Sequence, residues 1–524
     1  MRRTISTAVL ALALPMAALA VPAISLVQNN YSFLVPGQPN YGIAPSTIFI
    51  VVGTGMASTT TVSSLQNSNT GLPTSLNGAS VSVTVNGVTT HPAFYYAIAT
   101  QLALVLPAAT PVGTGTITVN FGGGSASAPI TVVPSALGFD TLYGSGTGLA
   151  VATNNSTGAV FNYTTSAAPG QTIVLWSSGL GADTADSDTT FTSNPHAVSV
   201  PLTVYIEGIQ AVVVYAGSSG YPGLNQVNVT IPAGVSPGCG VSVVAVGGSN
   251  VSNTVTIPVN PGGGVCADPV LGATGTQILN LGGKTTYNSG SVELDQATVG
   301  STVRNIATGN FVSQQGSQAA SGVGYVSLGN CVVTPQTGGA STFTPTQLDA
   351  GTLSVTGPLG TQTLKDNSGT YAVSLPAGFI PALGGTFTFN ATGGTTPGAS
   401  VGAFSASLNF SAPLVWSNMS SITAVNRAQG QTISWTGGLS NSFVIIEGGS
   451  TDSASQVSVT FICFAAASAG QITIPGYILD AMPAGTGSLE VGGETARGSF
   501  SASGLDQGNV FGFSGAAISN IPYN

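Results

Sequence analysis

Residues 80–88 read SVSVTVNGV, and this stretch decides the fold class of the chain. Valine alternates with serine or threonine, which is the two-residue period of a β-strand. The run ends in Asn86-Gly87, a dipeptide that favours a two-residue hairpin because a type I′ turn needs positive φ at both central residues. The stretch therefore predicts a β-hairpin.

Short β runs of the same kind recur along the chain and are separated by glycine and proline about every ten residues, a spacing typical of all-β sandwiches. Clear examples are residues 48–52, 102–106, 116–119 and 130–133. We find no long amphipathic helical pattern. The sequence predicts an all-β protein.

The first half contains an internal repeat. VTVNGV at residues 83–88 returns as VYIEGI at 204–209, an offset of 121 residues, and LVLP at 104–107 returns as VTIP at 229–232, an offset of 125 residues. A repeat of this length is a whole domain rather than a solenoid unit. The sequence therefore predicts two related domains in tandem.

These motifs give the first half a likeness to a known family. The first copy contains IAPS at 43–46 and LPTSLNGASVSVTVNGV at 72–88, and the second contains LNQVNV at 224–229 and SNTVTI at 252–257. On these motifs, residues 24–260 resemble the acidobacterial (Solibacter-type) secreted paired Ig-like domain family of uncharacterised function. The resemblance implies a pair of Ig-like (IPT/TIG-like) β-sandwiches on an exported protein, with no catalytic residues to transfer.

We divide the chain into five segments. Residues 1–20 are expected to be a signal peptide, because Arg2 and Arg3 precede a short apolar run and a small-residue cleavage site. Four β domains are then predicted, namely Ig-like sandwiches at 21–134 and 135–260, a β-rich domain at 261–412 after a Pro-Gly joint, and a sandwich at 413–524. No later apolar run is long enough for a membrane helix, so we expect no membrane span after signal removal.

Charge is scarce. Asp, Glu, Lys and Arg make up 4% of the chain, against about 25% in an ordinary soluble protein. After Arg3 the next basic residue is Lys284. Nucleic-acid binding needs clustered Lys or Arg, so the composition excludes a nucleic-acid partner.

The four cysteines are Cys239, Cys266, Cys331 and Cys463. An even number in an exported chain predicts two disulfides, for which three pairings are possible. We favour Cys239 with Cys266 and Cys331 with Cys463, because this pairing closes the shortest first loop and avoids crossed bridges. Free buried thiols are the alternative, and without a Cys-x-x-Cys motif a zinc or redox site has little support.

One loop contains a candidate metal site. Asp183, Asp186 and Asp188 lie close together in the sequence GADTADSDT. Carboxylate oxygens are the ligands that Ca²⁺ prefers, so calcium is the one cofactor that we consider, and a solvated acidic loop is the alternative. The only histidines, His91 and His196, fall in different predicted domains and form no metal pair.

The sequence contains no recognisable catalytic motif in the required context. The two G-x-S-x-G matches, residues 234–238 and 398–402, are not followed by the helix that a nucleophile elbow requires. The glutamates are scattered, and Glu207 occupies the turn position that Asn86 holds in the other copy. We therefore predict a protein that is not an enzyme.

Two functions remain open. The first is an exported structural or adhesive protein of the cell surface or extracellular space, whose partners are other copies or other surface proteins. It could self-assemble through strand edges, because few charges guard those edges against strand addition. The alternative is an extracellular carbohydrate-binding protein, with aromatic candidates Tyr95, Tyr96, Tyr215 and Tyr221. The tryptophans are expected to pack in cores.

Overall fold

The computed structural model describes residues 21–66, 70–192, 195–268, 272–300, 302–323, 329, 331–335 and 345–524. The predicted signal peptide, residues 1–20, lies outside the described residues. The described residues form mostly antiparallel β-sheets with short helices, so the predicted all-β class is confirmed. None of their helices is long and apolar enough to cross a membrane.

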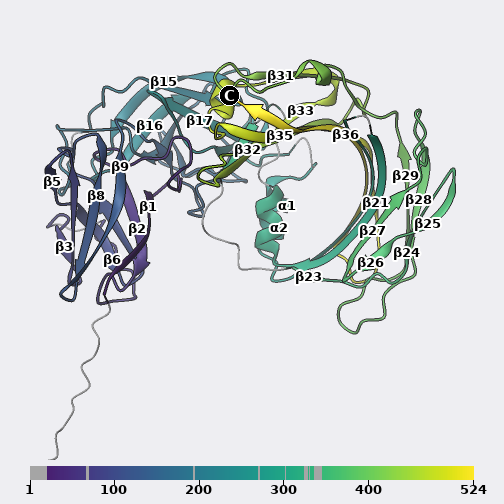
Figure 1. The fold of residues 1–524 in the computed structure, drawn as a ribbon, viewed down its shortest axis with the longest axis horizontal. Coiled ribbons are helices and arrows are strands. Elements are labelled where there is room, and N and C mark those ends of the chain that lie inside the picture. Colours follow the sequence, from purple (N-terminus) through teal and green to yellow (C-terminus); the bar gives the residue numbers. More distant parts are fainter. Residues whose placement is uncertain are drawn as a thin grey trace, which may run out of the picture.

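The first unit is a sandwich of two sheets (Figure 1). One sheet has the order β1 (Ala23–Asn29), β2 (Ile48–Thr54), β7 (Gln101–Val105) and β6 (Ala93–Ile98). The other contains β3 (Ser75–Leu76), β4 (Ala79–Val85), β5 (Val88–Thr90), β8 (Gly113–Phe121) and β9 (Gly124–Val132). Buried aliphatic side chains of both sheets, such as Val51 and Val83, form the core between them.

The hairpin between β4 and β5 has the predicted turn. Asn86 has a φ of 50° and Gly87 a φ of 80°. Along β4 every second residue is buried, as the alternating sequence requires. Positive φ at both turn residues is the type I′ geometry, and this prediction is confirmed.

The second unit contains ten strands in one connected sheet with the order β10, β13, β16, β15, β14, β17, β19 and β11, and with β12 and β18 beside it. Their bounds are β10 (Gly138–Phe139), β11 (Gly148–Leu149), β12 (Ala152–Asn154), β13 (Thr172–Ser178), β14 (Leu202–Ile206), β15 (Ile209–Ser218), β16 (Asn225–Thr230), β17 (Gly238–Gly247), β18 (Asn250–Val251) and β19 (Val255–Val259). The sheet folds over a core that includes Leu175, Val204 and Val243.

The two units share their strand pairing. β2 pairs with β7 as β13 pairs with β16, and the order β4, β8, β9 is matched by β14, β17, β19. They differ where His91-Pro92 separates β5 from β6, because β15 runs unbroken and pairs with both β14 and β16. Proline has no N–H for a ladder, which explains why the strand divides in the first unit.

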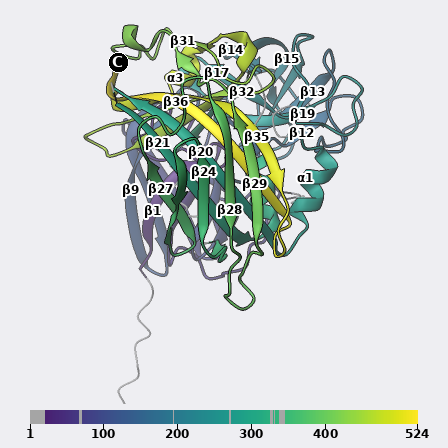
Figure 2. The ribbon, with the colours of Figure 1, turned by 90° about the vertical axis from the view of Figure 1, so that its right-hand side faces the viewer.

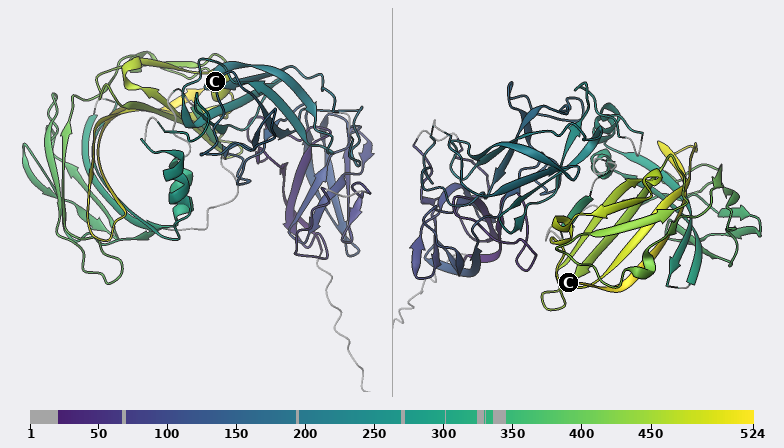
Figure 3. Two further views of the ribbon diagram at one scale, coloured as in Figure 1. Left: turned by 180° about the vertical axis from the view of Figure 1, so that it is seen from behind. Right: turned by 90° about the horizontal axis from the view of Figure 1, so that it is seen from above.

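One ten-stranded sheet dominates the second half, and we call it the curved sheet. It bends around helices α1 (Gly275–Gly282) and α2 (Gly316–Val323), as Figure 1 and the view from behind in Figure 3 show. Its order is β22 (Cys331–Pro335), β33 (Ser458–Ala466), β32 (Phe443–Thr451), β35 (Gly485–Phe500), β36 (Gln507–Tyr523), β20 (Tyr287–Val299), β21 (Thr302–Gln314), β27 (Thr370–Leu375) and β26 (Lys365–Asn367), with β23 (Thr346–Gln347) beside β21.

Two smaller sheets cover the outer face of the curved sheet. The first, in front in Figure 2, contains β25 (Gly360–Thr363), β24 (Leu353–Gly357), β28 (Gly385–Ala391) and β29 (Phe404–Phe410). The second contains β30 (Val415–Trp416), β31 (Gln431–Thr436) and β34 (Gln471–Ile474), with α3 (Gly476–Leu479) and the 3-10 turns Met419–Ser421 and Ala467–Ala469 nearby. Trp416 and Trp435 are buried in the core beneath this second sheet.

The curved sheet takes strands from both sides of residue 412. β20 pairs in parallel with β36, from Ser289 opposite Gln507 to Val299 opposite Ala517. The boundary that we placed between 261–412 and 413–524 therefore runs through one continuous hydrogen-bonded sheet. Local sequence patterns indicate which residues form strands, but they do not identify a partner strand two hundred residues away.

The disulfides have the pairing that we favoured. Cys239–Cys266 joins β17 to the segment before α1, and Cys331–Cys463 joins the neighbouring strands β22 and β33.

The units also pack against one another. At the first junction, between the first and the second unit, the Tyr95 hydroxyl donates to the Pro222 carbonyl at 2.7 Å. At the second junction, between the second unit and the second half of the chain, the rings of Tyr205 and Tyr477 are stacked with centroids 4.5 Å apart.

Candidate functional site

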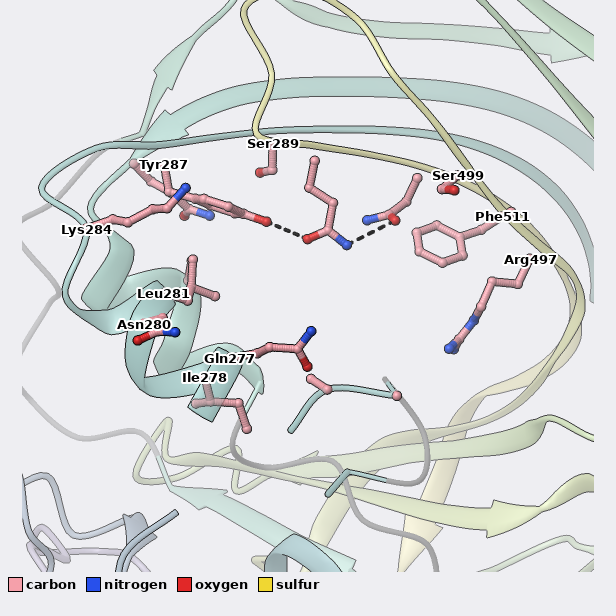
Figure 4. Close-up of a pocket in the computed structure, with 17 residues that line it drawn as sticks. Gln277, Ile278, Asn280, Leu281, Lys284, Tyr287, Ser289, Arg497, Ser499 and Phe511 are labelled. Carbon is pink, nitrogen blue, oxygen red and sulfur yellow. Dashed lines mark hydrogen bonds between the residues drawn. The ribbon is translucent and has the colours of Figure 1, made fainter. Parts of the chain in front are cut away.

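A cavity of about 800 Å³ lies between the helices and the concave face of the curved sheet, and we call it the groove (Figure 4). The helical segment contributes Gln277, Ile278, Asn280, Leu281 and Lys284 to its wall. The sheet contributes the polar side chains Ser289, Gln314, Ser499, Gln507 and Asn509. The volume is in the range of small-molecule sites, about 300–1,000 Å³.

Strand alternation directs these side chains into the groove. Along β20, Val292 and Leu294 are fully buried in the core on the outer face of the sheet. Successive side chains of a strand point to opposite faces, so Ser289, Ser291 and Glu293 belong to the concave face. The same alternation places Gln507, Asn509 and Phe511 of β36 on that face, since each is opposite one of these β20 residues.

A row of uncharged polar residues crosses four strands of the concave face. Ser291 of β20 is opposite Asn310 of β21 on one side and Asn509 of β36 on the other, and Asn509 is opposite Ser499 of β35. Neighbouring strands are about 4.8 Å apart, so the row is about 14 Å long. It offers amide and hydroxyl groups along a line perpendicular to the strands.

A chain of hydrogen bonds orders the floor of the groove (Figure 4). The Tyr287 hydroxyl donates to Gln507 Oε1, and Gln507 Nε2 donates to Asn509 Oδ1 at 3.2 Å. Burial, with a smaller contribution from the negative charge of Asp506, raises the pKa of Tyr287. Its hydroxyl therefore keeps its proton at neutral pH, and the two amides keep fixed orientations.

Arg497 is held in the wall by two kinds of contact. Its Nε donates to Glu494 Oε1 at 2.6 Å, and Glu494 also accepts a hydrogen bond from the Ser442 hydroxyl. The guanidinium lies over the rings of Phe443 and Phe511, 5.4 Å and 6.0 Å from their centroids. A guanidinium fixed by an ion pair and two rings loses little conformational freedom when a ligand binds.

Two carboxylates of β20 lie on the same face, outside the residues that line the groove. Glu293 is opposite Phe511, and Asp295 is opposite Phe513. Burial raises the pKa of both, and the adjacent Glu293 carboxylate helps to raise the pKa of Asp295 to about 8. Asp295 therefore keeps its proton at neutral pH beside the Glu293 carboxyl group.

The acidic loop of the sequence analysis has a different environment. Asp183 Oδ1 lies 2.7 Å from His196 Nε2, and both oxygens of Asp188 accept the Ala108 N–H at 3.0 and 3.1 Å. Asp186 accepts a hydrogen bond from Ser218 at 2.6 Å. Within the described part of the chain, no three His, Cys, Asp or Glu side chains are grouped to hold a metal ion. Asp188 thus links the second unit to the first, and calcium stays a prediction without a ligand set.

The tyrosines considered for ligand binding have structural contacts. Tyr95 is only 6% exposed at the first junction, where Tyr96 packs against the same cluster. The Tyr215 hydroxyl donates to two backbone carbonyls, and Tyr221 packs edge-on against Phe191.

The sequence analysis missed the groove residues. Residues 507–513 read QGNVFGF, in which polar or aromatic side chains alternate with glycine or valine. This pattern indicates a strand with one functional face. It does not reveal the neighbouring strands, whose side chains complete the row.

No protein-family model matches the chain, and no curated protein matches it. The family resemblance of the first half therefore stays a prediction. The solved structures to which the chain is similar include the titin Ig tandem domains A164-A165, with 8% identity, a TM-score of 0.13 and coverage of 46% of this chain and 96% of that one.

Two further matches are a protein of a glucan utilization locus and an S-layer protein. The SGBP-B protein of a Bacteroides ovatus mixed-linkage glucan utilization locus, solved with a mixed-linkage heptasaccharide, has 10% identity and a TM-score of 0.15, and covers 87% of this chain and 96% of its own. Domains 5-6 of the S-layer protein SbsC have 15% identity and a TM-score of 0.15, and cover 45% and 98%. At these TM-scores the matches carry no argument about function.

Proposed function

We propose that this chain is an exported, non-catalytic protein that binds a carbohydrate in the groove. The observation that carries the proposal is the four-strand row of Asn310, Ser291, Asn509 and Ser499 on the concave face, of which Asn509 and Ser499 line the groove together with Phe511. A saccharide presents many hydroxyls that need partners and an apolar C–H face that packs on an aromatic ring. Aligned amides and hydroxyls beside the half-buried ring of Phe511 supply both.

The dimensions favour an oligosaccharide over a single sugar. The row is about 14 Å long, and the groove volume is about 800 Å³. The hydrogen-bonded Tyr287, Gln507 and Asn509 are already ordered. A site ordered before binding loses less entropy when the ligand binds.

The compartment follows from other features. Two disulfides are typical of an oxidising, extracellular environment. The ligand would then be a saccharide of a cell surface or of the surrounding matrix. Binding it would attach the protein to that surface or matrix.

The self-association that the low charge predicts is a second candidate, favoured by one observation. Among the described strands that end a sheet, only β26, with Lys365 and Asp366, contains charged residues. Uncharged edges are poorly protected against strand addition. Sedimentation of the purified protein over a wide concentration range tests this, and a single monomeric species throughout would exclude it.

A glycan array tests the main proposal. We expect the purified protein to bind at least one class of oligosaccharide, and Gln507→Ala with Asn509→Ala to weaken that binding at least about tenfold through lost hydrogen bonds. The matched control is Asn390→Ala with Ser405→Ala, which removes paired, exposed polar side chains from the outer sheet. An array without hits, or equal loss in both variants, would contradict the proposal.

A further inference from the structure

We infer that a second cavity, between the second unit and the two helices, binds a neutral aromatic molecule with a polar end, such as a phenol. The cavity has a volume of about 450 Å³, within the range of small-molecule sites. Ile278 is the one described residue that lines both this cavity and the groove. The inference is independent of the saccharide proposed for the groove.

The two walls of the second cavity differ in chemistry. The second unit contributes the rings of Tyr143 and Tyr163. The helices contribute the aliphatic side chains of Ile278, Leu279 and Ala320. An aromatic ring that enters between the walls can pack on tyrosine with one side and on aliphatic carbon with the other. Aromatic pairs gain more than their buried area alone accounts for, so the tyrosine wall favours a ring over an alkyl chain.

The second cavity is apolar at its base and polar at its rim. Leu149, Tyr163 and Ile278 are buried and belong to one cluster with the two half-cystines of the first disulfide. The hydroxyl-bearing side chains of Ser145 and Ser317 also line the cavity, and both residues are exposed. This gradient fits a molecule whose apolar body enters first and whose polar end stays near solvent.

The lining also defines the charge of the ligand. No charged side chain is among the described residues that line the second cavity. A carboxylate or an ammonium group would lose its water there without gaining an ionic partner. Two large apolar side chains of the lining, Tyr143 and Leu279, are 73% and 42% exposed. Covering them with a neutral apolar group is favourable in proportion to the area removed from water.

The loop that carries Tyr143 is ordered by its own hydrogen bonds. Thr141 Oγ1 accepts the Ser145 N–H at 3.0 Å, and the Leu142 N–H donates to the Leu149 carbonyl at 2.9 Å. The exposed ring of Tyr143 is therefore attached to a fixed backbone. A site that is ordered before binding loses less entropy when the ligand binds.

Three probes that share an ethyl group test the ligand class. para-Ethylphenol has a ring and a hydroxyl, para-ethylcyclohexanol has no aromatic ring, and para-ethylbenzoate carries a carboxylate at neutral pH. By calorimetry we expect the phenol to bind at least about threefold more tightly than the cyclohexanol through aromatic contacts. We expect it to bind at least about tenfold more tightly than the benzoate, whose charge has no partner. Equal binding of the three probes, or no binding of the phenol at millimolar concentration, would overturn the inference.

Neighbouring alanines of α2 provide a matched pair of variants that assigns the probe to one cavity. Ala320 lines the second cavity, whereas Ala319 lines the groove. Ala320→Phe should abolish binding of para-ethylphenol by filling the second cavity, and Ala319→Phe should leave it unchanged. Tyr143→Ala, which removes an exposed ring, should weaken binding at least about threefold, and it keeps the test valid if Ala320→Phe does not fold.

The contrary results are equally specific. Binding that is lost in Ala319→Phe and retained in Ala320→Phe and Tyr143→Ala would place the probe in the groove and overturn the inference. Equal affinity of all three variants and the unmodified protein, or equal loss in all three, would overturn it too. None of these results bears on saccharide binding, which the glycan array tests separately.

Discussion

Glu494 and Arg497 lie three residues apart on β35, yet both side chains are on the concave face and form a 2.6 Å ion pair. Residues an odd number of positions apart normally point to opposite faces of a strand. A β-bulge between Glu494 and Ala496 removes this conflict, because Glu494 is opposite Phe513 while Arg497 is opposite Phe511. The bulge thus brings a carboxylate that is 2% exposed behind a guanidinium that lines the groove.

This pair predicts unequal effects of two substitutions. Arg497→Met should lower the free energy of unfolding by about 3 kcal/mol, because it leaves the Glu494 carboxylate buried without its cation. Glu494→Gln with Arg497→Met should recover most of that loss. Urea denaturation of both variants provides the measurement. Equal stability of Arg497→Met and the unmodified protein would show that the pair has no structural role.

The carboxylate pair on β20 predicts a pH dependence. The pKa of Asp295 is raised from 3.8 to about 8, so the folded state retains a proton that the unfolded chain has lost. The free energy of unfolding should therefore fall as pH rises from about 4 to about 8. Asp295→Asn, which resembles the protonated form, should reduce that fall by several kcal/mol, since each unit of the raised pKa corresponds to about 1.4 kcal/mol.

Denaturation of Asp295→Asn at several pH values checks this sign. Asp366→Asn, on the exposed strand β26, is the control, and it should follow the unmodified protein. A variant whose stability falls with pH as steeply as that of the unmodified protein would contradict the role assigned to Asp295.

The first disulfide predicts a link between stability and binding. Cys266 lies in the segment before α1, and its carbonyl accepts the N–H of Gly275, the first residue of that helix, at 2.8 Å. Cys239→Ala with Cys266→Ala opens a loop with a sequence separation of 27 residues, which should cost about 3–4 kcal/mol. Because α1 forms one wall of the groove, saccharide affinity should fall as well. Full affinity in a folded variant would show that the wall does not depend on this bridge.

Local signals in the sequence were sufficient for the all-β class and for the first hairpin, but not for the short helices or the groove. Asn86-Gly87 specifies its own turn, since both residue types readily adopt the positive φ that the turn requires and both have it in the structure. The pairing of Ser291 with Asn509 is different. It depends on the parallel register between two strands from opposite ends of the second half. Neither segment alone contains a sequence signal for that register.

The same contrast applies to the calcium candidates. Asp183 and Asp188 are close in sequence, but in the folded chain they turn to separate partners, His196 and the Ala108 backbone. Arg497 and Phe511 are unremarkable in the sequence, and they become a site only because a bulge and a neighbouring strand place them side by side.

Hydrogen–deuterium exchange with and without the best-binding oligosaccharide tests the central claim most directly. We predict that the ligand slows exchange in residues 507–511 of β36, in residues 289–293 of β20 and in α1, which surround the groove. Protection confined to the first two units, with these segments unchanged, would contradict the claim that a saccharide binds between the helices and the curved sheet.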